Sequence, residues 1–329
     1  MTAAGRRLTT SAMIASLAAE GQKTEAAPFG HALCRLAEAD PRVVGMTADL
    51  GRYTDLHVFA DRFPDRFYQM GMAEQLLMGA AAGMAREGFM PFATTYAVFA
   101  SRRAYDFICM AIAEEHLPVR IVCALPGLTT GYGPSHQATE DIAIFRGMPG
   151  MVIVDPCDAL DIAEAVPEVA AHPGPVYMRL LRGNVPRVLD GYGYRFRLGH
   201  AALLRDGADV LIISSGIMTM RALEAASLLA ADGISAAVLH SPTIKPLDSG
   251  TILAEAGKPA RLVVVAENHS EIGGLGEAVA ALLLRAGFAP HFRQIALPDR
   301  FLDAGALPTL HERYGISATA VARRIREWL

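Results

Sequence analysis

Met151-Val152-Ile153-Val154 is a short apolar run rich in β-branched residues, and a stretch with the spacing of a helix, Ala159 to Ala170, follows it. A strand followed by a longer helix is the repeating unit of a parallel sheet that helices cover. The same alternation extends outward along the chain, with strand-like or helical runs at Arg42 to Thr47, Leu76 to Arg86, Val119 to Ala124, Val210 to Ser214, Met220 to Ala231, Ser235 to Leu239, Arg261 to Ala266 and Gly276 to Ala286. We therefore predict an α/β protein with two doubly wound, mainly parallel sheets.

The segment from Arg182 to Gly199 separates the two series of strands and helices. It is dense in Gly, Pro, Arg and Tyr and lacks helical periodicity, which is typical of a connection between domains. The 329 residues of the chain are enough for two separate cores. We predict an N-terminal leader at residues 1–24, a first domain at residues 25–194 and a second domain at residues 195–329.

Composition argues against several classes of protein. The chain has 30 Lys and Arg against 34 Asp and Glu, a net charge of −4 and no basic block, whereas nucleic-acid binding needs clustered cations. Its 4 cysteines form no C-x-x-C pair, so we expect neither a disulfide framework nor metal ligands in this chain. The apolar runs are too short to cross a hydrocarbon layer of about 30 Å, and Met1 to Glu20 lacks a secretory apolar core. We expect a soluble, cytoplasmic protein with no membrane partner.

The helical run from Met72 to Arg86 has an unusual number of small side chains, among them Gly79 and Gly83. A glycine in a helix costs about 0.5–1 kcal/mol relative to alanine, so close approach of another helix or subunit is needed to offset it. We predict that this helix is buried nearly all round and that the protein is an oligomer. Glu74 in its first turn is either an acid favoured by the helix dipole or a buried carboxylate that requires a donor.

Two further segments carry groups suited to a ligand site. Tyr96 and Phe99 lie three residues apart, a spacing that serves core packing or the stacking of a flat heteroaromatic ligand. The segment from Thr129 to Asp141 follows an apolar strand and contains two glycines, a proline and His136. Loops at the carboxyl ends of parallel strands form ligand crevices. His136 is therefore a candidate for proton transfer, although bracing of the loop is an equally good interpretation.

Three motifs together resemble the transketolase family and its relatives that make deoxyxylulose phosphate. They are Phe67 to Gln75, the block from Tyr96 that ends in Arg103-Ala104-Tyr105-Asp106, and Gly133-Pro134-Ser135-His136-Gln137. The resemblance runs from about Asp40 to the C-terminus, and the later motifs Ala266-Glu267-Asn268-His269 and Gly273-Gly274-Leu275-Gly276 resemble the C-terminal domain of the family. The resemblance implies a pyrimidine-binding domain followed by a transketolase C-terminal domain.

The resemblance also implies a cofactor, thiamine diphosphate. In the family, the acid that matches Glu74 hydrogen-bonds the aminopyrimidine ring and favours the tautomer that activates the thiazolium carbon. The aromatic residues that match Tyr96 and Phe99 hold the pyrimidine by stacking, and the acid that matches Asp49 lies near the cofactor and the subunit contact. A buried carboxylate thereby gains a donor, and an aromatic pair gains a flat partner.

For the substrate, the resemblance implies that His136 faces the reacting carbonyl and that Arg182 binds the substrate phosphate, a role suited to a planar fork of donors. The chain departs from the family at two places. Tyr132 stands where the family usually has an aspartate that reads a donor hydroxyl, and a second phosphate-binding arginine is absent from the aligned stretch Glu25 to Phe29. Donor and acceptor identities are left open by these departures.

The N-terminal family domain, which binds the cofactor diphosphate through Mg²⁺, has no counterpart in this sequence: it contains no Gly-Asp-Gly motif and no phosphate-binding G-x-x-x-x-G-K-[ST] loop. We therefore predict the C-terminal (beta) subunit of a split transketolase, which transfers a two-carbon ketol unit between sugars or sugar phosphates. A separate N-terminal subunit would supply the diphosphate and Mg²⁺ site, in an α2β2 assembly that shares the thiamine diphosphate.

Other functions remain open from the sequence. Within the enzyme class, they are a deoxyxylulose-phosphate-synthase-like or other acyloin-forming enzyme with an oxo acid donor, and the beta subunit of a 2-oxo-acid dehydrogenase. Outside the enzyme class, the alternative is a noncatalytic scaffold subunit. A dinucleotide-binding module is disfavoured, because Val279 occupies the third glycine position of the G-x-G-x-x-G spacing that begins at Gly274.

Overall fold

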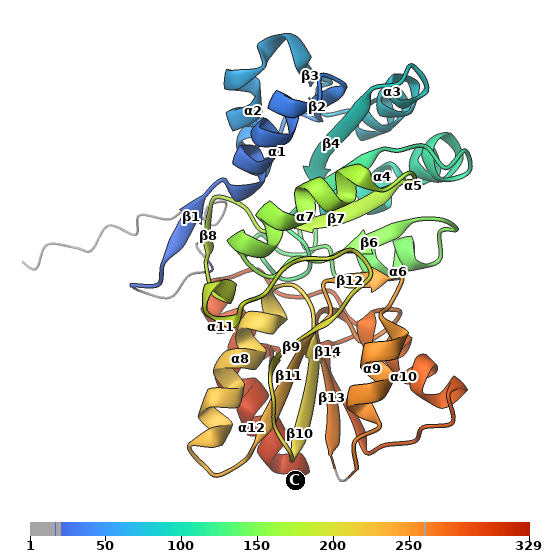
Figure 1. Cartoon of the computed structure of the whole chain (residues 1–329). Coiled ribbons are helices and arrows are strands. Elements are labelled where there is room, and N and C mark those ends of the chain that lie inside the picture. Colours follow the sequence, from blue (N-terminus) through green and yellow to red (C-terminus); the bar gives the residue numbers. More distant parts are fainter. Residues whose placement is uncertain (1–16, 18–20, 260) are drawn as a thin grey trace, which may run out of the picture.

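The computed structural model describes residue 17, residues 21–259 and residues 261–329. The expected leader at residues 1–24 therefore lies largely outside the described residues, although its last residue, Thr24, begins a strand. Two α/β units are stacked along the long direction of the molecule, the first above the second in Figure 1. Within the described residues, no helix combines the length and the apolar character needed to cross a membrane.

The first unit is built on a sheet with the strand order β12-β6-β7-β5-β4-β2-β3. The strands are β2 (Val43–Thr47), β3 (Phe67–Gln69), β4 (Met90–Tyr96), β5 (Arg120–Ala124), β6 (Val152–Val154), β7 (Val176–Leu180) and β12 (Thr243–Lys245). Neighbours from β6 to β3 are parallel, whereas β12 is antiparallel to β6. Because β12 comes from the second half of the chain, the C-terminal unit completes the sheet of the first.

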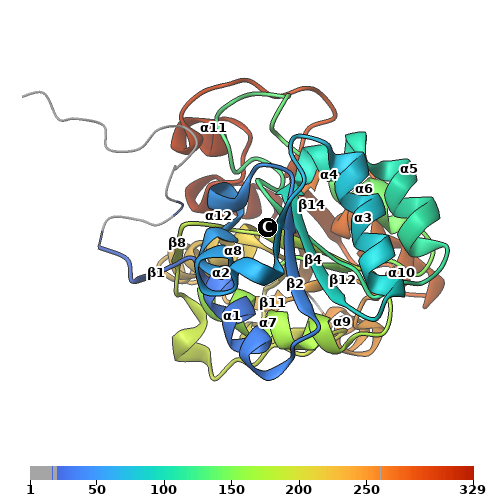
Figure 2. The ribbon, with the colours of Figure 1, turned by 90° about the horizontal axis from the view of Figure 1, so that it is seen from above.

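Helices cover both faces of this sheet, which explains why successive residues of its central strands are buried rather than alternately buried and exposed. One face carries α1 (Pro28–Ala39) and α7 (Ala159–Ala171), which pack side by side. The other carries α3 (Glu74–Arg86), α4 (Ala97–Arg103), α5 (Tyr105–Ile108), η4 (Cys109–Ala113) and α6 (Asp141–Arg146), as Figure 2 shows from above. Shorter elements are η2 (Gly51–Thr54), α2 (His57–Arg62) and η3 (Pro64–Arg66).

The second unit has a smaller sheet with the order β14-β13-β10-β11-β9. Its strands are β9 (Ala202–Arg205), β10 (Val210–Ser214), β11 (Ala236–His240), β13 (Leu262–Ser270) and β14 (Phe292–Leu297), and all neighbours are parallel except β9 with β11. The helices α8 (Ile217–Ala230) and α12 (Ala318–Trp328) lie on one side, and α9 (Ser249–Ala256) and α10 (Leu275–Arg285) on the other (Figure 1). The chain also forms α11 (Leu307–Arg313). The predicted fold class, two doubly wound and mainly parallel sheets, is confirmed.

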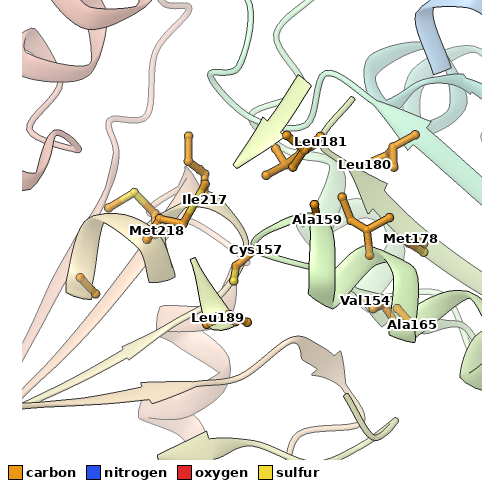
Figure 3. Close-up of a cluster of buried hydrophobic side chains, with 14 of the residues drawn as sticks. Val154, Cys157, Ala159, Ala165, Met178, Leu180, Leu181, Leu189, Ile217 and Met218 are labelled. Atoms are coloured by element: carbon orange, nitrogen blue, oxygen red, sulfur yellow. The ribbon is translucent and has the colours of Figure 1, made fainter. Parts of the chain in front are cut away.

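The connection between the units is not wholly irregular. It contains β8 (Asn184–Pro186), which pairs with β1 (Thr24–Ala26), and the short helix η5 (Leu189–Tyr192). A continuous apolar cluster then joins the two units. Figure 3 shows part of it, with Ile217 and Met218 of α8 on one side and Val154, Ala159 and Met178 of the first unit on the other. The units therefore share a core at their junction.

A buried ion network crosses the same junction. The Arg179 guanidinium is 1% exposed and donates to both oxygens of Asp141 at 2.8 and 2.9 Å. It also donates to Asp155 at 3.2 Å and to the backbone carbonyl of Asn268 at 3.0 Å. Because breaking a buried pair leaves an uncompensated charge, these contacts hold Asn268 firmly against the first sheet.

The helix α3 begins at Glu74, two residues later than predicted, and it is not buried nearly all round within this chain. Its outer side is open: Met72 before it is 80% exposed and Leu76 is 56% exposed. Gly79 and Gly83 have no atom within 4 Å of the position that a Cβ would take. The prediction of near-complete burial is wrong for the single chain, because the described residues place no neighbour on this small-residue face.

Candidate functional site

The candidate site lies at the point where the strand order of the first sheet reverses. The chain passes from β2 to β3 on one side and then to β4 on the other side of β2. At such a switch point the loops that leave the carboxyl ends of the strands diverge and leave a crevice for a ligand. Asp49 follows β2, Glu74 follows β3, Tyr96 ends β4 and His136 lies in the loop after β5. Four successive strands thus bring the predicted residues to one edge.

An aromatic cluster forms the centre of this site. The ring centroids of Tyr96 and Phe99 lie 5.7 Å apart. The His136 imidazole lies edge-on to both, at 6.0 Å from Tyr96 and 5.5 Å from Phe99, and Tyr132 faces the same imidazole at 5.3 Å. The Tyr96 hydroxyl is buried without a hydrogen-bond partner. The structure therefore brings together the aromatic pair, His136 and Tyr132.

Glu74 is connected to this cluster through an arginine that the sequence analysis left without a role. The Glu74 side chain is 2% exposed, and its carboxylate accepts a hydrogen bond from Arg103 at 2.8 Å. The Arg103 guanidinium also lies 4.4 Å from the centroid of the Phe99 ring, close enough for a cation–π contact. Of the two sequence interpretations of Glu74, the structure supports the buried carboxylate paired with a donor.

The Arg103→Met substitution tests how much this pair contributes to stability. Loss of the cation leaves a buried carboxylate without its charge partner, and because Arg103 itself is half exposed we expect the free energy of unfolding to fall by roughly 1–2 kcal/mol. Urea denaturation measures the change. Arg86→Met is the matched control on α3, because its pair with Glu115 is exposed at both ends. Equal effects of the two substitutions would contradict the assignment.

The surroundings of His136 change the pKa of its imidazole. Burial among the rings lowers the pKa of its imidazole, and the Ser135 hydroxyl lies 2.9 Å from its Nδ1. A histidine with a lowered pKa is neutral near pH 7 and is able to accept or share a proton. Burial also raises the pKa of Tyr96, so this phenol keeps its proton. The centre of the site thus holds neutral, polar groups.

Arg182 lies at the side of the cluster, after the end of β7. Its guanidinium carbon is 5.7 Å from the centroid of the Tyr53 ring, and its charge acts on Tyr96. The next residue, Gly183, donates its N–H to both carboxylate oxygens of Asp55 at 3.0 and 3.2 Å. Burial raises the pKa of Asp55 to about 7. Tyr53 and Asp55 are further site residues that the sequence analysis missed, since neither belongs to a quoted motif.

Asp49 is exposed and lies apart from the aromatic cluster. Its backbone N–H donates to the Gln69 side-chain oxygen at 2.7 Å, and its carboxylate accepts from the Gln69 amide at 3.1 Å. These contacts link the ends of β2 and β3. No hydrogen bond or ring contact of the described residues joins Asp49 to the aromatic cluster.

Metal-ligand atoms gather elsewhere. Among the described residues, Cys157, Asp161 and His240 bring three potential ligand atoms together, and all three side chains are buried. The Asp161 carboxylate is already engaged, since it accepts from the Cys157 backbone N–H at 2.8 Å and lies 2.9 Å from His240 Nε2. This trio lies at the junction of the two units and contributes no ligand to the site at the switch point.

Comparison with known proteins agrees with this architecture. Residues 22–188 match the family model of the transketolase pyrimidine-binding domain, and residues 199–321 match that of the transketolase C-terminal domain. An uncharacterised transketolase family protein of Sinorhizobium fredii, y4mN, is 73% identical over 324 residues, covering 98% of this chain and 94% of that protein. The 6-deoxy-6-sulfo-D-fructose transketolase subunit SqwH of a Clostridium species is 40% identical over 296 residues, covering 90% and 91%.

A solved structure gives the same result. A split-gene transketolase, described as an inactive β4 tetramer, superposes with a TM-score of 0.83 and is 39% identical, covering 92% of this chain and 97% of that one. The match extends over both units, which have the same arrangement in the two structures. The chain therefore belongs to the transketolase family and consists of its pyrimidine-binding and C-terminal domains.

Proposed function

We propose that this chain is the C-terminal, or beta, subunit of a split thiamine-diphosphate-dependent transketolase, which transfers a two-carbon ketol unit between sugars. The observation that carries the proposal is the meeting of Glu74, Tyr96, Phe99 and His136 at the switch point of the first sheet. A buried carboxylate, a pair of rings and a neutral imidazole are the groups that binding and activation of a flat, protonated heterocycle require. We place the working division between the two domains near residue 195 and the protein in the cytoplasm.

The pyrimidine half of thiamine diphosphate fits the chemistry of these groups. The nearly inaccessible Glu74 carboxylate is suited to accept a hydrogen bond from a ring nitrogen, and the buried Tyr96 hydroxyl lacks a hydrogen-bond partner. When bound, the cofactor supplies a nucleophilic carbon that attacks a ketose carbonyl. Glu74 would hold the proton at the pyrimidine nitrogen, Tyr96 and Phe99 would hold the ring, and Asp49 is the remaining proposed cofactor contact.

The diphosphate half of the cofactor requires a partner. Across the part of the chain that the structure describes, no group of three or more metal-ligand side chains lies at the candidate site. A diphosphate needs a metal or a cationic cradle to offset its charge. We therefore propose that a separate N-terminal transketolase subunit supplies the Mg²⁺ and diphosphate site and that the thiamine diphosphate lies between the two polypeptides.

The open face of α3 supports self-association. Beside Met72 and Leu76, the nearby Phe107 and Met110 are 44% and 57% exposed. An exposed apolar surface of this kind, next to glycines that leave room for a neighbouring backbone, favours close packing of a second subunit. The split-gene relative forms a tetramer of its beta chains. We propose that two copies of this chain pair through this face in an α2β2 enzyme.

For the substrate we propose a sugar with a terminal anion, a phosphate in the first instance. His136 would stabilise the alkoxide that develops from the substrate carbonyl, and Arg182 would bind the anion. The relative SqwH is named for 6-deoxy-6-sulfo-D-fructose, another sugar that ends in an anion. One observation favours an oxo acid donor as the second candidate, since Tyr132 places a ring beside His136 where an acid would read a sugar hydroxyl.

The Arg182→Met substitution tests the anion site. Methionine keeps an apolar stem beside Tyr53 but removes the guanidinium, so KM for a phosphorylated sugar should rise by about 10- to 100-fold, as for the loss of a charged hydrogen bond. KM for the same sugar without its phosphate should stay unchanged. Steady-state kinetics of the assembled enzyme measures both values. Arg195→Met is the control, because this arginine of the same connection is exposed and paired with Glu164. Equal KM changes for both sugars would contradict the assignment.

The experiment that tests the function as a whole is reconstitution. The chain is co-purified with the partner subunit and titrated with thiamine diphosphate and Mg²⁺, and products are then analysed with either a ketose phosphate or pyruvate as the donor. We expect thiamine diphosphate to bind only when both subunits are present. We also expect the ketose phosphate to act as the donor of the two-carbon unit. Turnover with pyruvate would instead favour a deoxyxylulose-phosphate-synthase-like enzyme, or, with acyl transfer, a 2-oxo-acid dehydrogenase beta subunit. Assembly without turnover would favour a scaffold.

A further inference from the structure

The loop that carries His136, residues 125–140, is fixed near its start by the C-terminal unit. The side-chain oxygen of Asn268 accepts a hydrogen bond from the Leu128 N–H at 2.8 Å, and its amide nitrogen donates to the Pro126 carbonyl at 3.3 Å. Asn268 is 2% exposed, so these bonds do not compete with water. His311 Nε2 lies 2.8 Å from the Leu128 carbonyl. Burial lowers the pKa of His311 to about 4, so the ring is neutral and Nε2 is its donor.

The middle and the end of the loop are held in the same way. The Gly305 N–H donates to the Gly131 carbonyl at 3.0 Å, and the Gln137 side chain donates to the Asp303 carbonyl at 3.1 Å. The Ser270 N–H donates to the Thr139 carbonyl at 2.7 Å. The C-terminal unit therefore contacts the loop before, beside and after His136.

Two glycines make this close approach possible. A Cβ at Gly127 would lie 2.2 Å from the Asn268 carbonyl oxygen, and a Cβ at Gly131 would lie 2.1 Å from the Gly305 carbonyl oxygen. Neither distance is sterically allowed, and at both positions the nearest atom in the way is a backbone oxygen. The absence of a side chain at these two positions allows the loop backbone to lie directly against the C-terminal unit.

His136 itself depends on the backbone of this loop. Its imidazole contacts Ser135 and the rings of Tyr96, Phe99 and Tyr132, all of which belong to the first unit. The titratable groups among them are the two tyrosines. No hydrogen bond or ring contact of the described residues joins the imidazole to the C-terminal unit, so that unit acts on His136 only through the position of the loop.

We propose that Asn268 is a positioning residue and that the C-terminal domain sets the place of His136 against Tyr96 and Phe99 by clamping the loop. This inference rests on the proposed function only in giving His136 a task with the substrate. It assigns to the C-terminal domain a direct part in the geometry of the site, although the domain contributes none of the predicted site side chains. Asn268 was quoted in a sequence motif, yet the sequence did not indicate what it contacts.

The test replaces Asn268 by leucine, which has a similar volume and cannot form either hydrogen bond. The first readout is the titration of His136 in the full chain, followed by NMR with ¹³C-labelled histidine and assigned with His136→Gln. Because burial among the rings lowers the pKa of His136, release of the loop should raise it toward its ordinary value. The second readout is kcat/KM of the enzyme assembled with its partner, which should fall by about 10- to 100-fold, the loss expected for a displacement of about 1 Å.

The matched control is Gln294→Leu, which also replaces a side-chain amide by leucine, on the adjacent strand β14. The Gln294 amide donates to Glu267 at 2.9 Å and to the Glu271 carbonyl at 3.1 Å, and neither acceptor lies in the loop. We expect no change in the His136 titration or in kcat/KM. Should Asn268→Leu fail to fold, Gly131→Ala displaces the loop from its other side, because its Cβ would meet the Gly305 carbonyl.

The outcomes separate this inference from the function on which it rests. An unchanged His136 titration in Asn268→Leu, or in Gly131→Ala where that variant takes its place, overturns the positioning role. A raised His136 pKa together with wild-type turnover of His136→Gln supports the clamp and overturns the proposed role of His136 in catalysis. A raised His136 pKa and a reduced kcat/KM in Asn268→Leu, with neither change in Gln294→Leu, support both the clamp and the proposed role of His136.

Discussion

Glu74→Gln in the reconstituted enzyme is expected to lower turnover by about 10²- to 10⁴-fold, the range that a positioned acid or base contributes. Glutamine has nearly the same shape and still accepts a hydrogen bond from Arg103, so packing at the start of α3 is kept. It cannot hold the exchangeable proton that we assign to the carboxylate. Stopped-flow or coupled-assay measurement of kcat with the ketose phosphate donor checks the loss.

Assembly has to be measured beside turnover for this prediction to be informative. The complex of Glu74→Gln with the partner subunit should have the same mass as the wild type by light scattering. Glu87→Gln at the other end of α3 is the matched control, since Glu87 is exposed and should leave kcat unchanged. A wild-type rate for Glu74→Gln would remove the proposed proton transfer and favour a scaffold.

The sequence predicted the fold class and the positions of β2, β5 and β6, and it singled out most residues of the candidate site, because these depend on short-range patterns. It did not indicate β3, β4 or β7. The run from Val119 to Ala124 is apolar apart from Arg120, so its position can be read directly, and the loops after parallel strands must lie at one edge. Tyr96 ends β4, His136 lies in the loop after β5, and Glu74 follows the short strand β3. Their meeting is a consequence of topology, and the structure confirms that their loops share one edge.

What the sequence did not predict depends on contacts between residues far apart. The strand β12 joins the first sheet although it follows most of the second unit, and a three-residue strand carries too little periodicity to be detected. Arg103 was quoted in a motif, yet its pairing with Glu74 requires knowledge of how α3 and α4 pack. The near-complete burial predicted for α3 failed because the residues that would cover its glycine face are not in this chain's described structure.

The two units contribute different groups to the site. The first unit supplies the side chains, because its strand ends converge at the switch point. The second unit supplies backbone contacts and the side chains of Asn268 and His311, which meet the loop around Gly127 and Gly131 of the first unit. A variant that removes one of these contacts in either unit should therefore reduce turnover, and only variants in the first unit should remove a reacting group.

His136→Gln is expected to lower kcat/KM by about 10²- to 10³-fold, in the range of loss for a group that stabilises a developing alkoxide. Glutamine retains a hydrogen-bond donor but cannot exchange a proton near neutral pH. Burial lowers the pKa of His136, so the neutral imidazole persists to lower pH than for an exposed histidine. The acidic limb of the pH profile of kcat/KM should thus lie below the ordinary histidine range in the wild type and should be absent from the variant.

His200→Gln, on an exposed histidine of the second unit, is the control and should keep both the wild-type rate and the acidic limb. An acidic limb that persists unchanged in His136→Gln would assign it to another group and leave His136 as a brace of its loop.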